Sequence, residues 1–164
     1  MKGLSLTQPW ASLVASGAKT IETRSWRTNY RGLVAIHAAL RFPKYAQYFA
    51  TSQDASQALK AAGFGHFREL RVGVIVAVAE LTRCIPTERV WFSLDGVDRW
   101  PTHPDDHLVV SREKAFGDYT AGRWAWVLAN AVQLPQPMRC KGRLGLWDVP
   151  TEIEAQILEQ MNRD

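Results

Sequence analysis

The chain has 164 residues, of which 46% are hydrophobic and 22% are charged, close to the average of globular proteins. This composition excludes wholesale disorder, and no apolar run reaches the roughly 18 to 20 residues that a membrane span needs. We expect a single folded domain over residues 1–164, without a secretory signal or membrane segment, in the cytoplasm.

Positive charge is concentrated in two parts of the chain, whose formal net charge is +4. Residues 1–45 contain seven Lys and Arg residues but one acid, Glu22, and residues 139–143 add three more basic residues. This asymmetry predicts a basic face that meets an anionic partner, most commonly nucleic acid. A basic surface that serves only solubility explains the charge equally well.

The first helix is expected to follow Thr7, which can cap it, with Pro9 in its first turn. Gly17 is expected to end it in a left-handed conformation. Residues 19–26 and 33–38 are then predicted to form strands.

A second helix is predicted over residues 43–62, and a central, Val- and Ile-rich strand over residues 70–83. A loop is expected over residues 93–107. The segment "RWAWVLANAVQL" predicts another strand, stopped by Pro135 and Pro137.

"KGRLGLWDV" predicts a glycine-punctuated strand or tight turn, and residues 151–162 a final helix. Thr151 and Glu154 are expected to form a capping box at its start. Because the strands and helices do not alternate regularly, we predict an α+β fold, a mixed sheet or barrel with peripheral helices.

A metal site is not expected. His103 and His107 are four residues apart with two aspartates between them, but the prolines at 101 and 104 favour a loop over a ligand-bearing helix. No nucleotide-binding glycine motif is present, and we expect no cofactor.

Lys19, Glu22, Arg24 and Trp26 form a dense group of functional side chains, and period-two alternation puts the last three on one strand face. An aromatic ring beside a cation is suited to holding a base, because the ring stacks and the cation meets phosphate. A catalytic alternative has Lys19 as electrostatic stabiliser and Glu80 as general base. The structural alternative is a buried Lys–Glu ion pair.

The motif G-x-K-x-x-E-x-R, in "GAKTIETRSW", resembles the signature of the ASCH domain family. Matching blocks occur before and after it, in "LSLTQPWASLV", "YRGLVAIHAA", "FGDYTAGRWAWVL" and "KGRLGLWDV". The resemblance covers roughly residues 3–149 and implies a PUA-like β-barrel with helices packed around it and a cleft lined by the signature residues.

The resemblance also implies which residues line that cleft. The signature supplies Lys19, Glu22 and Arg24, and chains close to this one also carry Gln8, Trp10 and Trp26. Polar residues inside the other matching blocks complete the expected ligand-binding set: His37, Arg123 and Lys141.

By this resemblance, the chain is expected to bind RNA, single-stranded nucleic acid or a nucleotide or nucleoside in a basic cleft. The alternatives are a ribonuclease, or an amidohydrolase acting on N4-acetylcytidine with Lys19, Glu22 and Glu80 as catalytic residues. That enzyme's proposed triad has a Thr three residues after its Lys, where this chain has Glu22. A protein-interaction module is the third possibility.

Overall fold

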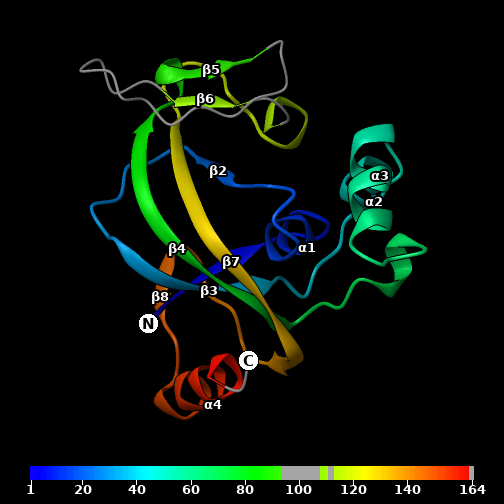
Figure 1. The fold of residues 1–164 in the computed structure, drawn as a ribbon, viewed down its shortest axis with the longest axis vertical. Helices are drawn as coiled ribbons and strands as arrows, with labels where there is room; N and C mark the ends of the chain where they lie inside the picture. The colour runs from blue at the N-terminus through cyan, green and yellow to red at the C-terminus, as the bar shows by residue number, and fades with distance from the viewer. Residues whose placement is uncertain (94–107, 111–112, 163–164) are drawn as a thin grey trace.

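The computed structural model describes residues 1–93, 108–110 and 113–162, and its centre is a mixed six-stranded sheet with the order β2-β7-β4-β3-β1-β8 (Figure 1). β1 runs parallel to β3, and the other neighbours in this sheet are antiparallel. Its strands are β1 (Lys2–Leu6), β2 (Ile21–Arg24), β3 (Gly32–Ala38), β4 (Val74–Pro86), β7 (Trp124–Arg139) and β8 (Leu146–Asp148).

A separate parallel pair is formed by β5 (Val90–Phe92) and β6 (Leu108–Val110). The α-helices are α1 (Trp10–Ala15), α2 (Lys44–Ala50), α3 (Gln53–Ala61) and α4 (Thr151–Met161), and the short 3₁₀ turns are η1 (Phe67–Glu69), η2 (Thr87–Arg89) and η3 (Glu113–Phe116). The predicted α+β class with a mixed, barrel-like sheet and peripheral helices is confirmed.

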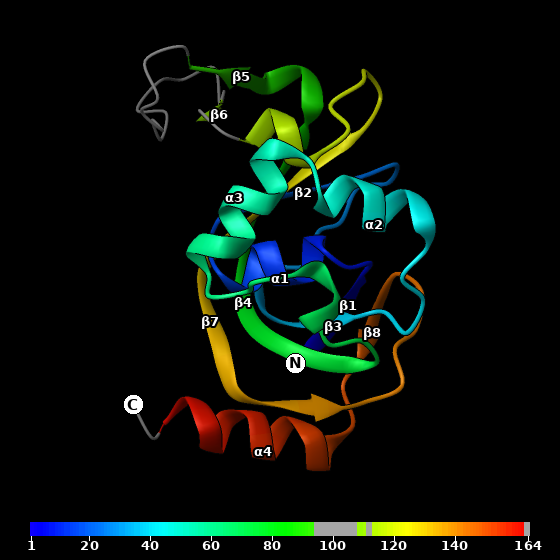
Figure 2. The ribbon, with the colours of Figure 1, turned by 90° about the vertical axis from the view of Figure 1, so that its right-hand side faces the viewer.

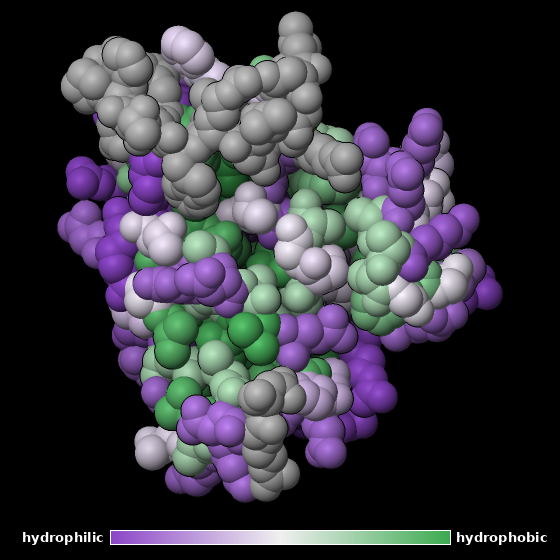
Figure 3. All heavy atoms as spheres, viewed as in Figure 1, coloured by the Kyte–Doolittle hydropathy of each residue, from purple (hydrophilic) through white to green (hydrophobic). Residues whose placement is uncertain are grey.

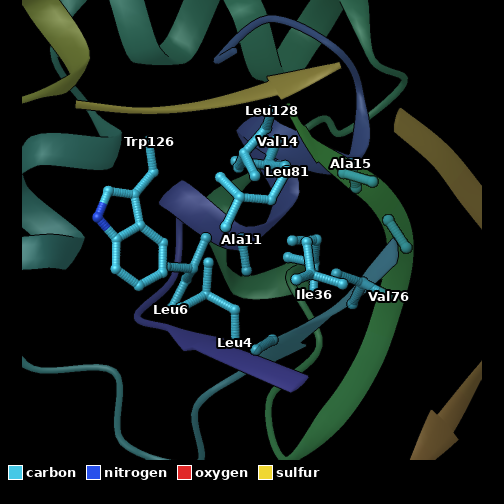
Figure 4. Packing of buried hydrophobic residues seen from close by; sticks show 14 of the residues in the cluster. Leu4, Leu6, Ala11, Val14, Ala15, Ile36, Val76, Leu81, Trp126 and Leu128 are labelled. Atoms are coloured by element: carbon cyan, nitrogen blue, oxygen red, sulfur yellow. The ribbon is translucent and has the colours of Figure 1, made fainter. Parts of the chain in front are cut away.

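The two longest strands, β4 and β7, bend the sheet into a half-barrel (Figures 1 and 2). Their ladder contains three register shifts, and such irregularities bend strands and increase their twist. α1 lies in the resulting hollow, where Ala11 and Val14 pack with Leu81, Leu128 and other residues of the sheet (Figure 4). Five of the six residues of α1 are buried, as expected for a helix enclosed on all sides.

The remaining helices cover α1 and the outer face of the sheet. Leu13 of α1 packs with Ala50 and Leu59, so α2 and α3 close the hollow from the side away from the sheet. α4 lies on the convex face, where Ile157 is fully buried against Val78. Viewed from the side shown in Figure 3, hydrophobic residues gather over the central strands, with hydrophilic residues around them.

Most predicted strands are present, but their pairing was not apparent from the sequence. β4 lies between β7 and β3, which confirms that the 70–83 segment is central. The predicted strands 19–26 and 33–38 correspond to β2 and β3, but β2 pairs with β7 at the edge of the sheet.

The predicted helix boundaries need two corrections. α1 begins after Pro9 with no side-chain cap, so Thr7 does not cap it, whereas Gly17 does adopt a left-handed φ of +74°. The predicted helix 43–62 is two helices, because the hydroxyl oxygen of Ser52 accepts a hydrogen bond from the amide of Ala55 and starts a new one.

The strand "RWAWVLANAVQL" does not stop at Pro135 and Pro137, since β7 continues to Arg139. The ladder with β4 is irregular between the pairs Ala77–Gln133 and Ile75–Met138. Both prolines lie in this irregular stretch, where no ladder hydrogen bond depends on their missing N–H groups.

The C-terminal helix is present as predicted, but its capping box is not. Pro150 precedes the helix, no side chain caps it, and Thr151 is already its first residue. Glu154 instead forms an ion pair with the α-ammonium group of Met1, which connects the helix to β1. Among the described residues, no helix combines the length and the hydropathy that crossing a bilayer requires.

Gly3 tests how tightly β1 packs against the sheet. A Cβ atom at this position would lie 2.5 Å from Cε2 of the buried Trp147 ring. We expect Gly3→Ala to lower the free energy of unfolding by about 1–3 kcal/mol, because the rigid ring cannot move aside. Urea unfolding measures this. Gly65→Ala is the control, since its Cβ would meet only the end of the flexible Glu69 side chain; equal losses in the two variants would contradict the prediction.

Candidate ligand-binding cleft

A cleft of about 730 Å³ opens where α1 does not fill the hollow of the sheet. Its walls are the end of β1 with the start of α1, the segment from Glu22 to Trp26, one side of α2, and residues 115–118 together with Arg123. Four separate segments of the chain therefore meet at one concavity.

Strand alternation explains why β2 contributes charged side chains to this cleft. Ile21 and Thr23 are buried, whereas Glu22 and Arg24 are only half-buried. In the ladder with β7, Glu22 lies opposite Trp126 and Arg24 opposite Trp124. Trp126 belongs to the core cluster of the hollow, and Trp124 packs against that cluster. Because cross-strand partners share a face, Glu22 and Arg24 point to the concave side.

Two tryptophans give the cleft aromatic walls. Trp26 is 38% exposed, and its ring meets the buried Trp126 ring edge-on at a centroid distance of 4.6 Å. Trp10 stacks on Phe49 of α2, with centroids 4.8 Å apart and the planes 11° from parallel. Both rings are therefore held by neighbouring aromatic rings while they line the cleft.

The charged groups of the cleft are paired. Nε of Arg24 lies 3.1 Å from a carboxylate oxygen of Glu22, and its Nη2 donates to the carbonyl oxygen of Ser5 at 3.0 Å. Nε of Arg123 lies 3.4 Å from a carboxylate oxygen of Asp118. The lining thus has two cations and two carboxylates, so it is less basic than the sequence led us to expect.

A family model, the ASCH domain, matches residues 4–137, which is most of the chain. The chain belongs to the ASCH domain family. The human protein "Activating signal cointegrator 1" is 50% identical over 40 residues, and that match spans 24% of this chain and 7% of the human protein. The chain thus covers only a small part of this relative's length.

The ASCH fold is also seen in a solved structure. The crystal structure of a point mutant of ZmASCH from Zymomonas mobilis aligns with 96% of this chain and 96% of its own, with a TM-score of 0.51 and 14% sequence identity. This likeness supports the PUA-like architecture and says nothing about the ligand.

Lys19 of the ASCH signature lies beneath the cleft and does not line it. The side chain is 1% exposed, and its Nζ donates to the carbonyl oxygen of Ile21 and lies 3.7 Å from a carboxylate oxygen of Glu22. This arrangement matches the buried Lys–Glu pair that was the structural alternative. Lys19 supports Glu22 from behind, while the other side of the carboxylate is bound by Arg24.

Glu80 lies on the opposite face of the sheet from the cleft. Its neighbours Ala79 and Leu81 belong to the core of the hollow, so strand alternation directs Glu80 to the convex side. There its carboxylate accepts a hydrogen bond from the Asn130 side chain at 3.1 Å. The interpretation of Glu80 as a general base at the signature residues was therefore wrong.

Besides Lys19, three further expected ligand residues lie outside the cleft lining. The buried Gln8 amide is occupied, since Nε2 donates to Ser12 and to the Arg71 carbonyl oxygen and Oε1 accepts from the Ser12 amide. His37 is buried, its Nε2 donates to the Cys140 carbonyl oxygen at 2.9 Å, and burial lowers its pKa. Lys141 is exposed in the segment before β8.

Five of the nine expected ligand residues are brought together at the cleft: Trp10, Glu22, Arg24, Trp26 and Arg123. Tyr45, Phe49 and Asp118 also line it and were not predicted. Within the described part of the chain, no group of three or more His, Cys, Asp or Glu residues is arranged to hold a metal ion. The pair His103 and His107 lies outside the described residues.

Glu113, at the start of η3, is a buried acid that the sequence did not single out. It is 3% exposed, and its Oε1 accepts hydrogen bonds from the Thr20 amide, the Thr20 hydroxyl at 2.7 Å and the Ile21 amide at 3.2 Å. Burial raises the pKa of this carboxyl group, and the charge of Lys19 together with these hydrogen bonds opposes the rise. The only hint in the sequence is its place just before the matching block that begins at Phe116.

The raised pKa of Glu113 predicts a pH-dependent stability. The folded state binds the proton more tightly than the unfolded state, so stability falls as pH rises from the ordinary carboxyl pKa through the raised one. Glu113→Gln keeps an acceptor oxygen for Thr20 and Ile21 but cannot titrate, so this part of the decline is expected to vanish. Urea unfolding between pH 4 and 8 measures it, and parallel pH profiles for the two proteins would contradict the assignment.

Comparing Glu113→Ala with Glu113→Gln separates the effect of losing the hydrogen-bond acceptor from the effect of losing the charge. It leaves two buried amides and one hydroxyl without their acceptor, which is expected to cost about 2–4 kcal/mol of unfolding free energy at pH 7. A loss no larger than that of Glu113→Gln would show that the hydrogen bonds contribute little.

Proposed function

We propose that this ASCH domain binds single-stranded RNA, or a nucleotide or nucleoside, by holding one base in the cleft. The observation that carries the proposal is the exposed ring of Trp26 beside the Glu22–Arg24 pair, on the same wall. The association of the ASCH family with nucleic-acid binding supports it. A volume of about 730 Å³ is within the usual range of small-molecule pockets, roughly 300–1,000 Å³.

The wall matches the two chemical features of a base, its face and its edge. A base stacked on Trp26 gains roughly 1–3 kcal/mol. The Glu22 carboxylate is an acceptor for an exocyclic amine, and the Arg24 guanidinium is a donor for a ring nitrogen or carbonyl oxygen. Glu22 is held by Arg24 and Lys19 on its two oxygens, so its acceptor position is set before a ligand arrives.

The balance of charge in the cleft favours recognition of the base over recognition of phosphate. Arg24 and Arg123 each have a carboxylate partner, and a phosphate placed between them would also approach Glu22 and Asp118. A neutral base avoids this repulsion. Binding of a nucleoside in the cleft is therefore expected to depend little on salt.

The hydrolytic alternatives receive no comparable support. Amide hydrolysis on an N4-acylated cytidine was assigned to Glu80 as general base, and Glu80 faces away from the cleft. Ribonuclease chemistry by a histidine pair finds no histidine among the described residues that line the cleft.

Replacement of Trp26 tests the proposal. We expect Trp26→Ala to weaken binding of a fluorescein-labelled, random-sequence five-nucleotide RNA by about 5- to 150-fold, because a stacking surface is lost. Fluorescence anisotropy measures this affinity. Calorimetry with the four nucleoside monophosphates measures the affinity of the cleft for a single nucleotide.

The matched control is Trp91→Ala, which removes a tryptophan that is 57% exposed and lies outside the cleft lining. Thermal unfolding of both variants checks that the fold is kept. Unchanged affinity in Trp26→Ala, or no binding of RNA or nucleotides below millimolar concentration by the wild-type protein, would overturn the proposal.

A further inference from the structure

α2 carries an aromatic and basic surface that continues outward from the cleft. Tyr45 is 66% exposed and lines the cleft, and Tyr48, one turn further along the helix, is 83% exposed. α2 packs inward through the small residues Ala46 and Ala50 and keeps these two large rings outside. Burial within the folded chain therefore does not account for the two rings.

The helical repeat arranges these residues in two adjacent rows. Tyr45 and Phe49 are four residues apart and form the row that lines the cleft. Lys44 and Tyr48 are also four residues apart and form the neighbouring row, further from the cleft. The outer row thus pairs one cation with one aromatic ring.

The stretch of sequence that contains α2 carries acidic or basic side chains of one sign only. Residues 23–53 contain five basic residues and no Asp or Glu. Arg41 and Lys44 are exposed, and neither forms an ion pair within the part of the chain that the structure describes. This differs from the cleft, where each cation has a carboxylate partner.

From these observations we infer that α2 binds the nucleotides that adjoin the base held in the cleft of a single-stranded RNA. Tyr48 stacks on a flanking base, while Lys44 and Arg41 meet the phosphates between the bases. Exposed aromatic rings alternating with cations are how sequence-tolerant single-strand sites are built. The inference rests on the proposed function, because the cleft provides the point from which the strand extends.

The test compares ligands of two lengths. Tyr48→Ala is expected to weaken binding of the five-nucleotide RNA by about 5- to 150-fold and to leave the affinity for a nucleoside monophosphate unchanged. Tyr48→Phe, which keeps the ring, is expected to bind both ligands like the wild type. Trp26→Ala is expected to weaken both.

A salt series tests the phosphate contact. Lys44→Gln is expected to reduce the slope of log affinity against log salt by about 0.7 for the five-nucleotide RNA, the value for one phosphate contact on a single strand. Lys60→Gln, which removes an exposed lysine from α3, is the control and is expected to leave the slope unchanged.

The outcomes separate the two proposals. If Trp26→Ala weakens binding of the five-nucleotide RNA and Tyr48→Ala does not, the proposed role of α2 is overturned and the cleft proposal stands. If the wild-type protein binds neither ligand, both are overturned. If sedimentation shows that the wild type self-associates and Tyr48→Ala is monomeric, the surface joins two copies of this chain and the inference is wrong.

Discussion

The cleft depends on the hydrogen bonds that connect Glu113 to the start of β2. One buried carboxylate oxygen accepts hydrogen bonds from the backbone amides of Thr20 and Ile21 and from the Thr20 hydroxyl. These bonds join η3 to a segment more than 90 residues earlier in the sequence. The wall formed by residues 115–118 begins within η3, and the wall formed by Glu22 and Arg24 follows directly from Ile21. The nearby charge of Lys19 favours the ionised form of this buried carboxyl group, so the signature lysine contributes to holding the two walls as well as to orienting Glu22.

Local sequence patterns were sufficient to identify elements whose structure is determined by residues close together in the sequence. Apolar runs and period-two alternation identified β2, β3 and β4, and Gly17 marked the end of α1 because its positive φ is a property of the residue itself. The predictions that Thr7 and Thr151 cap helices were wrong, because Pro9 and Pro150 occupy the positions immediately before α1 and α4. Strand order was beyond such reasoning, since the pairing of β2 with β7 joins segments about 100 residues apart.

The candidate site divides in the same way. Glu22, Arg24 and Trp26 were found because they lie on one short segment whose geometry is local. The prediction for Glu80 failed because it depended on which face of β4 points into the hollow. Ala79 and Leu81 join the core there, but in an almost wholly apolar strand the sequence pattern does not show which face that is. Tyr45, Phe49 and Glu113 come from segments whose approach to β2 depends on packing around α1.

Under the proposed function, the separation of charge between the cleft and its surroundings gives the two regions different roles in binding. Long-range attraction of a polyanion depends on unpaired surface charge, which α2 and its approach carry, whereas the two cations of the cleft are paired. Short-range discrimination depends on donors and acceptors held in fixed positions, and the Glu22–Arg24 pair, supported by Lys19 and Ser5, provides these at little cost in reorganisation. Under the proposed function, a basic N-terminal third attracts nucleic acid electrostatically, although the cleft proposed to hold the base is nearly neutral.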